Sequence, residues 1–283
     1  MPQRREFNRR LHKHRALRNF RFRGVIRGGT IIDKGDALPD IEMPNGTTIH
    51  PANLLGEGSG GAVFADPAYP HWAVKIMNRH DDHDDVRAIR KLGAINCGQI
   101  QGVAVGTTSR GEDVVVLERM QYDTRKDRVR LIDAIKEVGK CNSDIEACVH
   151  IAEIIRQQLI CLIRQGLYYL DLKSENVMFN LDNDRLVKLA LVDLGSIGDD
   201  GMNMNKAMMT YPDCDTKMQC VAYQLGMFLA ELLGRRTFMG NGREMRDLAI
   251  EELTKANVAT DLLTAKSDDE SWLALSTRIS LNV

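Results

Sequence analysis

The sequence predicts an α+β fold with two lobes, a β-rich first lobe and a mostly helical second one. Strand-like segments dominate from about residue 31 to residue 120, and helical periodicity dominates after residue 121. A chain of 283 residues with 43% hydrophobic content can bury a core large enough for this arrangement. We therefore expect a basic N-terminal arm at 1–30, a first lobe at 31–120 and a second lobe at 121–283.

The N-terminal arm is defined by its charge. Residues 1–28 carry ten Lys and Arg residues and a single Glu, a net charge of +9 that leaves −10 for the rest of the chain. Such an arm is typical of contact with a polyanion, either nucleic acid or an acidic surface. A plain solvated tail is the alternative, and the lack of lasting helical periodicity in the arm favours it.

The first lobe begins with a predicted hairpin. Asn45-Gly46 lies between the strand-like segments IEMP and TTIH, and this dipeptide is a strong turn signal. The segments WAVKIM (72–77) and EDVVVLERM (112–120) are typical of further strands, the second a buried one. Between them, residues 81–95 are predicted to form a helix.

The second lobe is predicted to be mostly helical. A long helix is expected from about Asp144 to Gly166, where glycine ends it. Further helices are predicted near 218–233 and 243–255, and the segment LVKLALV (186–192) is strand-like.

The segment LLGEGSGGAVF contains the pattern Gly56-x-Gly58-x-x-Gly61-x-Val63. Glycines at such positions let backbone N–H groups approach phosphate oxygens without interference from a Cβ atom. A dinucleotide-binding fold shares this spacing but requires a helix to begin at the glycines. Because strand-like residues follow here instead, we predict a hairpin that covers phosphates.

Lys75 lies at the centre of the apolar segment WAVKIM. A buried ammonium needs a partner, and Asp85 in the following helix qualifies by its face and position. We favour phosphate contact for Lys75 over a stem that lies along the sheet with its head in water. The His/Asp cluster at 80–85 could suggest a metal site, but acids in the first turn of a helix are ordinarily explained by the helix dipole.

Two polar motifs complete the pattern. Asp171-Leu172-Lys173-Ser174-Glu175-Asn176 lies between the long helix and a strand, and Asp193-Leu194-Gly195 follows a second strand, so a strand hairpin would bring them together. With the glycine pattern and Ala73-Val74-Lys75, they occur in the order and approximate spacing of the protein kinase signature set. Over about residues 50–235, the chain resembles the eukaryotic-type protein kinase family in a compact and divergent form.

The resemblance implies a role for each polar residue. Asp171 would accept or orient the proton of the substrate hydroxyl, and Lys173 would neutralise the transferring phosphoryl group. Asn176 and Asp193 would hold Mg²⁺. A lysine two positions after the aspartate is the serine/threonine pattern.

On the nucleotide side, the resemblance implies that Lys75, held by Asp85, contacts the α and β phosphates of ATP. Leu117 takes the gatekeeper position, and backbone groups of Glu118 and Met120 would face adenine. The remaining residues expected to contact the nucleotide are Gly56, Gly58, Gly61, Val63 and Ala73.

The sequence departs from the family pattern in several places, including a short segment from Asp193 to Asp213 and the sequence TYPDCD at 210–215. Tyr169-Leu170 replaces the usual His-Arg, so a phosphorylated activation segment would lack its usual arginine partner. Asp85 is one methylene shorter than the usual glutamate, and Val221 stands where an anchoring aspartate is usual. The second lobe is also shortened.

We therefore predict an ATP- and Mg²⁺-dependent serine/threonine protein kinase acting on protein hydroxyls. One alternative is a pseudokinase or scaffold that acts through the basic arm, and another is a small-molecule kinase. Retention of Lys75, Asp171, Asn176 and Asp193 argues against a binding-only protein.

Cysteine usage and hydropathy indicate the compartment. The six cysteines show no zinc-type spacing and a chain of this length does not need disulfides, so we expect them to be reduced. No apolar run approaches the ~20 residues of a membrane span. We predict an intracellular, cytoplasmic protein with no transmembrane segment, with nuclear or virion association left open.

Overall fold

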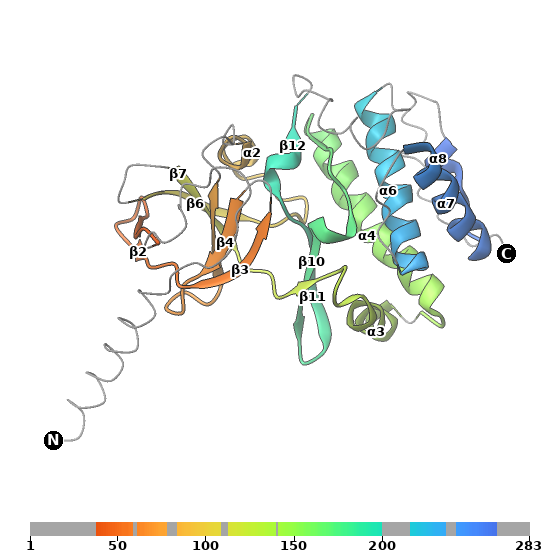
Figure 1. Ribbon diagram of the computed structural model, residues 1–283, viewed down its shortest axis with the longest axis horizontal. Helices are drawn as coiled ribbons and strands as arrows, with labels where there is room; N and C mark the ends of the chain where they lie inside the picture. The colour runs from red at the N-terminus through yellow and green to blue at the C-terminus, as the bar shows by residue number, and fades with distance from the viewer. Residues whose placement is uncertain are drawn as a thin grey trace. The chain divides into compact units, whose positions relative to one another are not determined.

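The computed structural model describes residues 38–58, 61–77, 84–108, 113–139, 141–199, 216–235 and 242–264. The chain divides into two compact units (Figure 1). The first unit comprises the residues up to Gly93 together with Gln101–Arg119, and the second comprises Ala94–Ile100 and the residues from Met120 onward. The basic arm lies outside the described residues.

The predicted α+β class is confirmed, with an antiparallel sheet in the first unit and most of the helices in the second. The sheet of the first unit has the strand order β2-β1-β6-β7-β5-β4-β3. Its strands are β1 (Ile41–Glu42), β2 (Thr48–Ile49), β3 (Asn53–Gly58), β4 (Gly61–Ala65), β5 (Trp72–Met77), β6 (Gly102–Thr108) and β7 (Asp113–Glu118). The helix α2 (Asp84–Leu92) contacts β6 and β7.

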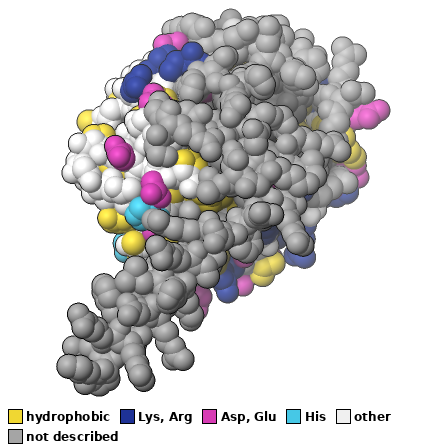
Figure 2. All heavy atoms as spheres, turned by 60° about the vertical axis from the view of Figure 1, so that its left-hand side comes forward, with side chains coloured by type: hydrophobic (Ala, Val, Ile, Leu, Met, Phe, Trp, Pro, Cys, Tyr) yellow, Lys and Arg dark blue, Asp and Glu magenta, His cyan; other side chains and the backbone are white. Residues whose placement is uncertain are grey.

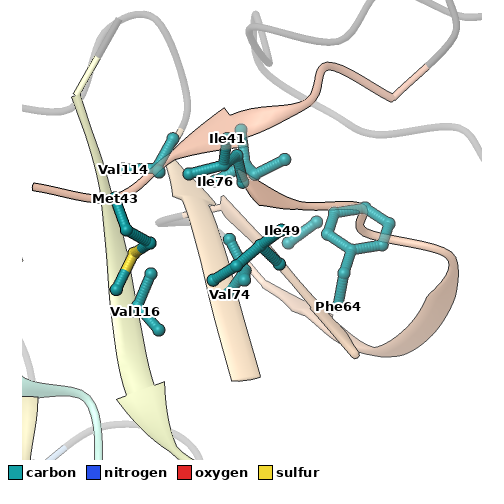
Figure 3. Packing of buried hydrophobic residues seen from close by; sticks show 9 residues of the cluster. Ile41, Met43, Ile49, Phe64, Val74, Ile76, Val114 and Val116 are labelled. Atoms are coloured by element: carbon teal, nitrogen blue, oxygen red, sulfur yellow. The ribbon is translucent and has the colours of Figure 1, made fainter. Parts of the chain in front are cut away.

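The predicted hairpin at Asn45-Gly46 is confirmed. Gly46 has a φ of 79°, which glycine adopts without the Cβ penalty, and Ile41 of β1 pairs with Ile49 of β2. Both isoleucines are fully buried in one apolar cluster of this sheet (Figure 3). The cluster also contains Met43, Ala62, Phe64, Val74, Ile76, Val114 and Val116.

The helix predicted at 81–95 is described from Asp84 and ends at Leu92, earlier than expected. Gly93 follows with a φ of 49°, and its N–H donates to the carbonyl of Ile89 at 2.9 Å. A left-handed glycine immediately after the last helical residue is a common way for a helix to end.

The second unit contains five described helices. They are α3 (Arg128–Gly139), α4 (Asp144–Arg164), α6 (Lys217–Gly234), α7 (Gly242–Lys255) and α8 (Asp261–Thr264). The apolar helix α6 contacts α4, α7 and α8, so it forms the centre of this unit.

Helix α4 has clear signals at both ends. The Ser143 side chain accepts a hydrogen bond from the N–H of Glu146, which caps the first turn. At the other end, Gly166 has a φ of 71°, and the N–H groups of Gly166 and Leu167 donate to Ile163 and Leu162. The predicted glycine end of this helix is therefore confirmed, in the form of a Schellman motif.

The second unit also contains two small sheets. One has the order β11-β10-β8, and the other pairs β12 with β9. Their strands are β8 (Tyr122–Asp123), β9 (Tyr168–Tyr169), β10 (Val177–Asp182), β11 (Arg185–Leu191) and β12 (Ile197–Gly198). Asn183 and Asp184 both have positive φ and close the hairpin between β10 and β11.

The expectation that all cysteines are reduced is wrong for two of them. Cys97 and Cys161 form a disulfide within the second unit, although 64 residues separate them. Cys148 and Cys220 are buried free thiols and Cys141 is a half-buried one. The pairing is a tertiary contact, so spacing along the chain did not reveal it.

The described surface is mixed in character. Figure 2 shows acidic, basic and apolar side chains scattered over the described part of one face. Within the described ranges, every helix is too short or too polar to cross a membrane.

Candidate active site

The glycine pattern lies in a strand-turn-strand hairpin, as the sequence predicts. Strand β3 pairs with β4 so that Gly56 lies opposite Val63 and Gly58 opposite Gly61. Gly61 has a φ of 142°, and a Cβ atom there would clash with the carbonyl oxygen of Ile76 in β5. A glycine is therefore required for β4 to approach β5 closely.

Lys75 and Asp85 form a buried ion pair in the first unit. The Nζ of Lys75 lies 2.6 Å from Oδ2 of Asp85, and their side chains are 11% and 3% exposed. Lys75 pairs with Val63 across β4, while Ala73 of the same strand is buried opposite Leu117. Asp85 on α2 therefore reaches Lys75 although aspartate is one methylene shorter than glutamate. The ammonium is held on β5, the strand that pairs with β4 of the glycine hairpin.

The residues predicted to face adenine fall on either side of the division between the units. Leu117 is buried in β7, and the N–H of Glu118 donates to the carbonyl of Gln101 at 2.9 Å. An adenine contact at Glu118 would therefore have to use its carbonyl. Met120 is a buried residue at the start of the second unit's longer segment.

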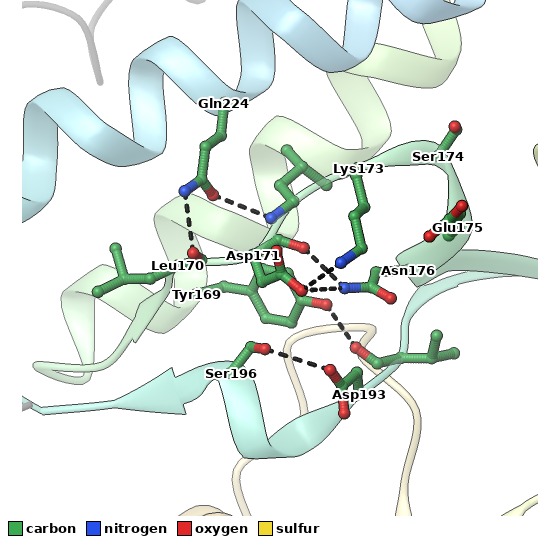
Figure 4. Close-up of polar contacts among 12 residues, drawn as sticks. Tyr169, Leu170, Asp171, Lys173, Ser174, Glu175, Asn176, Asp193, Ser196 and Gln224 are labelled. Carbon is green, nitrogen blue, oxygen red and sulfur yellow. Dashed lines mark hydrogen bonds and ion pairs between the residues drawn. The ribbon is translucent and has the colours of Figure 1, made fainter. Parts of the chain in front are cut away.

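The motif at 171–176 forms a compact loop in the second unit (Figure 4). Oδ2 of Asp171 accepts hydrogen bonds from Nζ of Lys173 at 2.7 Å and from Nδ2 of Asn176 at 2.8 Å. The same amide nitrogen also donates to the backbone carbonyl of Asp171 at 2.8 Å. Asp171 is thus oriented by both predicted polar neighbours, and its Oδ1 accepts no hydrogen bond from any described residue.

The loop is anchored to α6 by a residue that the sequence did not reveal. Gln224 is fully buried; its Oε1 accepts from the N–H of Leu172, and its Nε2 donates to the carbonyl of Leu170, both at 2.9 Å (Figure 4). These two bonds flank Asp171 on both sides. Glu231 adds a third anchor, because its Oε2 accepts from the N–H of Ser174 at 2.9 Å.

Gln224 and Glu231 are seven positions apart in the apolar part of α6, so they lie on one face of the helix. Val221, which occupies the usual position of the anchoring aspartate, is buried one turn earlier. In the sequence, two polar residues seven positions apart in an apolar segment were the signal that could have identified this anchor.

Asp193 lies just after the hairpin of β10 and β11, which follows the 171–176 loop. The N–H of Val192 donates to the carbonyl of Asn176 at 2.9 Å, so the two motifs lie side by side in this unit. Asp193 has φ 57° and ψ 66°, a left-handed conformation that is costly for a residue with a Cβ atom. Ser196 helps to hold this turn, since its N–H donates to the carbonyl of Asp193 at 3.0 Å.

Tyr169 provides a further link between the two motifs. Its side chain is 1% exposed, and its hydroxyl donates to the carbonyl of Val192 at 2.5 Å. Strand β9 also pairs with β12, and the N–H of Leu170 donates to the carbonyl of Ser196 at 3.0 Å. The tyrosine that replaces the usual histidine therefore fixes the peptide immediately before Asp193.

Asn176 and Asp193 both carry side-chain oxygen atoms, the ligand type that Mg²⁺ prefers. The Nδ2 of Asn176 donates to Asp171, which leaves the amide Oδ1 as an acceptor. An amide oxygen and a carboxylate are hard oxygen ligands of the kind that Mg²⁺ prefers. No group of three His, Cys, Asp or Glu residues among the described ones could hold a metal ion, and His80, Asp81, Asp82 and His83 lie outside the described ranges.

Three solved structures share this fold. The ROP18 kinase domain in complex with AMP-PNP and sucrose matches with a TM-score of 0.53 and 14% identity over 86% of this chain and 85% of its own. The PknI kinase domain of Mycobacterium tuberculosis matches with 0.53 and 15% over 78% and 88%. The CAK complex of Chaetomium thermophilum bound to ATP-gamma-S matches with 0.50 and 19% over 74% and 68%.

In sequence, no protein-family model and no curated protein matches the chain. The structural likeness covers most of the chain, and the described strands and helices follow the order expected from the motifs. The chain therefore has a protein kinase-like fold.

Proposed function

We propose that this protein is an ATP- and Mg²⁺-dependent serine/threonine protein kinase. The single observation that carries the proposal is the arrangement around Asp171. Lys173 and Asn176 both bind one of its carboxylate oxygens, and Oδ1 takes no hydrogen bond from the described residues. That oxygen is left to accept the hydroxyl proton of a substrate.

Each remaining residue has a part in phosphoryl transfer, which depends mainly on positioning and charge neutralisation. Lys75 contacts the α and β phosphates of ATP, and Asp85 holds its ammonium in place. Lys173 lies beside the proton acceptor and neutralises the transferring group. Asn176 and Asp193 hold Mg²⁺, which when bound neutralises the phosphate oxygens.

The nucleotide assignment also draws on the structural neighbours. The ROP18 kinase domain was solved with AMP-PNP and the CAK complex with ATP-gamma-S. By analogy, we place ATP against the glycine hairpin of β3 and β4, with the Leu117 to Met120 strand end at adenine. The lysine two residues after Asp171 supports serine/threonine specificity and a protein substrate.

The test is transfer from γ-labelled ATP to a generic protein substrate with Mg²⁺. Asp171→Asn should lower transfer by at least about 100-fold, the usual scale for a positioned proton acceptor. Asp193→Asn should also lower transfer, because it replaces a carboxylate proposed to hold Mg²⁺. Asp133→Asn, an exposed change in α3, is the matched control. Phosphoamino-acid analysis should give phosphoserine or phosphothreonine.

Other results would contradict this assignment in distinct ways. Equal transfer by the Asp171 variant would refute its role. Nucleotide binding without any transfer would identify a pseudokinase, and labelling of small molecules alone would identify a small-molecule kinase.

We also propose a cytoplasmic location and a polyanion contact for the basic arm. A cytoplasmic location is supported by the need for ATP and tested by cell fractionation. The arm proposal is supported by its +9 charge. Deleting residues 1–28 should weaken binding to a nucleic-acid duplex and flatten its salt dependence, while an unchanged salt slope would favour a plain tail.

A further inference from the structure

The segment Ala94–Ile100 has an unusual place in the chain. It lies between α2 and β6 of the first unit, yet it belongs to the second unit. Gln99 is 1% exposed and shapes the segment: its Oε1 accepts from the N–H of Cys97 at 2.7 Å, and its Nε2 donates to the carbonyl of Ile95 at 2.9 Å. The chain therefore crosses into the second unit and back through a tightly bonded turn.

This segment is fastened to α4 by the disulfide. Cys97 is joined to Cys161 with a Cα–Cα distance of 5.4 Å. One turn earlier on α4, the side chain of Gln158 lies against Gly98, where a Cβ atom would come within 3.0 Å of it. The disulfide and this contact lie on neighbouring turns of one helix, so they hold the same short piece of chain.

Gln158 and the 94–100 segment also form hydrogen bonds with the end of β11. The Nε2 of Gln158 donates to the carbonyl of Leu189 at 2.7 Å, and its Oε1 accepts from the N–H of Leu191 at 3.3 Å. The N–H of Ile100 donates to the carbonyl of Leu191 at 2.8 Å. Leu191 is two residues before Asp193, so the segment is bonded directly to the strand that leads into the candidate metal ligand.

We propose that the Cys97–Cys161 disulfide is a reversible redox clip that holds residues 94–100 against α4 and keeps the end of β11 in its bonded position. The structural part of this inference is independent of the kinase assignment. Its predicted effect on Mg²⁺-nucleotide affinity rests on that assignment.

The chemistry requires a thiol reductant such as glutathione. Its thiolate attacks Sγ of Cys161, the half-buried partner, while Cys97 is only 8% exposed. The S–S bond breaks, a mixed disulfide forms at Cys161, and Cys97 leaves as a thiolate and takes a proton. A second glutathione thiolate then releases Cys161, which takes a proton, and oxidised glutathione carries away the disulfide.

Two of the other described thiols, Cys141 and Cys148, are poor competitors in this exchange. Burial raises the pKa of Cys148 to about 11, and burial also raises the pKa of the Cys141 thiol. Because the thiolate is the reactive form, neither residue attacks the disulfide readily near neutral pH. The proposed exchange therefore uses an external reductant in preference to Cys141 or Cys148.

The first test uses the full chain purified without reductant. Alkylation under denaturing conditions followed by peptide mass spectrometry should find Cys97 linked to Cys161. Reduction by dithiothreitol should lower Tm by on the order of 10 °C, because it opens a long covalent loop. Amide hydrogen exchange at Ile100 and Leu191 should accelerate by about tenfold or more.

Variants separate the clip from a general loss of stability. Cys97→Ser and Cys161→Ser should each reproduce the fast exchange of the reduced chain and make it insensitive to dithiothreitol. Cys141→Ser removes a half-buried thiol outside the bridge and should behave as the native chain does. Two alkylated thiols at 97 and 161 in the oxidised sample, or exchange unaffected by reduction, would overturn the clip.

Nucleotide binding then tests the connection to Asp193. The Kd of an ATP analogue with Mg²⁺ should rise by roughly fivefold on reduction, the lower range of typical coupling between sites. An unchanged Kd beside faster exchange would overturn this connection. A chain that binds no nucleotide in either redox state would refute the kinase proposal, while the exchange data would still decide the clip.

Discussion

Replacing Gln224 tests whether α6 anchors the 171–176 loop. Gln224→Met keeps the length of the side chain but removes both the acceptor for Leu172 and the donor for Leu170. Both backbone groups belong to buried residues, 2% and 4% exposed, so water reaches them poorly. An unsatisfied buried group costs about 1–3 kcal/mol, which gives about 2–6 kcal/mol for the pair.

The loss can be measured as a shift in thermal unfolding. For a domain of this size, 1 kcal/mol corresponds to about 2–4 °C, so the expected fall in Tm is about 10 °C near the centre of the range. The amide of Leu172 should also exchange faster, because its acceptor is gone. Gln157→Met, at an exposed position of α4, is the matched control and should unfold like the native chain.

A second variant, nearly identical to glutamine in shape, tests the hydrogen bond to Leu170 by itself. Gln224→Glu keeps an oxygen for the N–H of Leu172 but places another oxygen against the carbonyl of Leu170. It should therefore also destabilise the protein. If Gln224→Met unfolds within about 1 °C of the native chain and the Leu172 amide stays slow to exchange, the anchoring argument is wrong.

Three further predictions concern single contacts. Asp85→Ala removes the carboxylate beside the buried ammonium of Lys75 and should lower the free energy of unfolding, measured in urea, by about 3–5 kcal/mol. An unchanged urea midpoint would show that the pair is not buried in solution. Tyr169→Phe leaves the carbonyl of Val192 without its hydrogen-bond donor and should lower the free energy of unfolding by about 1–3 kcal/mol in calorimetry. In steady-state kinetics it should change kcat more than KM. Native values in both measurements would count against the link between Tyr169 and Asp193. Because burial raises the pKa of Cys148 to about 11, iodoacetamide at pH 8 should label it slowly until urea unfolds the chain, and rapid native labelling read by mass spectrometry would contradict this.

Local signals in the sequence were sufficient for much of the fold. Asn45-Gly46 predicted its hairpin, and Gly166 predicted the end of α4, because both depend on the positive φ that glycine adopts. The glycine pattern predicted a strand hairpin in place of a helix, since the residues after Gly61 are strand-like. The relative order of Asp171 and Asp193 then placed them on one hairpin of the second unit.

Features that depend on distant residues were missed. Gln224 is 53 positions from Asp171, and Cys97 is 64 from Cys161, so neither contact has a periodicity that could reveal it. Helix α3 is a different case, because Leu131 and Ile135 are buried at i, i+4 spacing and the pattern was present. Its short apolar face lies between charged residues, which weakened the signal.

The anchor on α6 has a consequence for the behaviour of the loop in acid. A glutamine amide both donates and accepts hydrogen bonds, and it has no proton to gain or lose over the working range of a protein. An aspartate at such a position would lose its charge-assisted bonds on protonation. The two bonds of Gln224 therefore do not depend on the protonation of their own side chain, and the anchor between α6 and the 171–176 loop keeps its donor and its acceptor in acid.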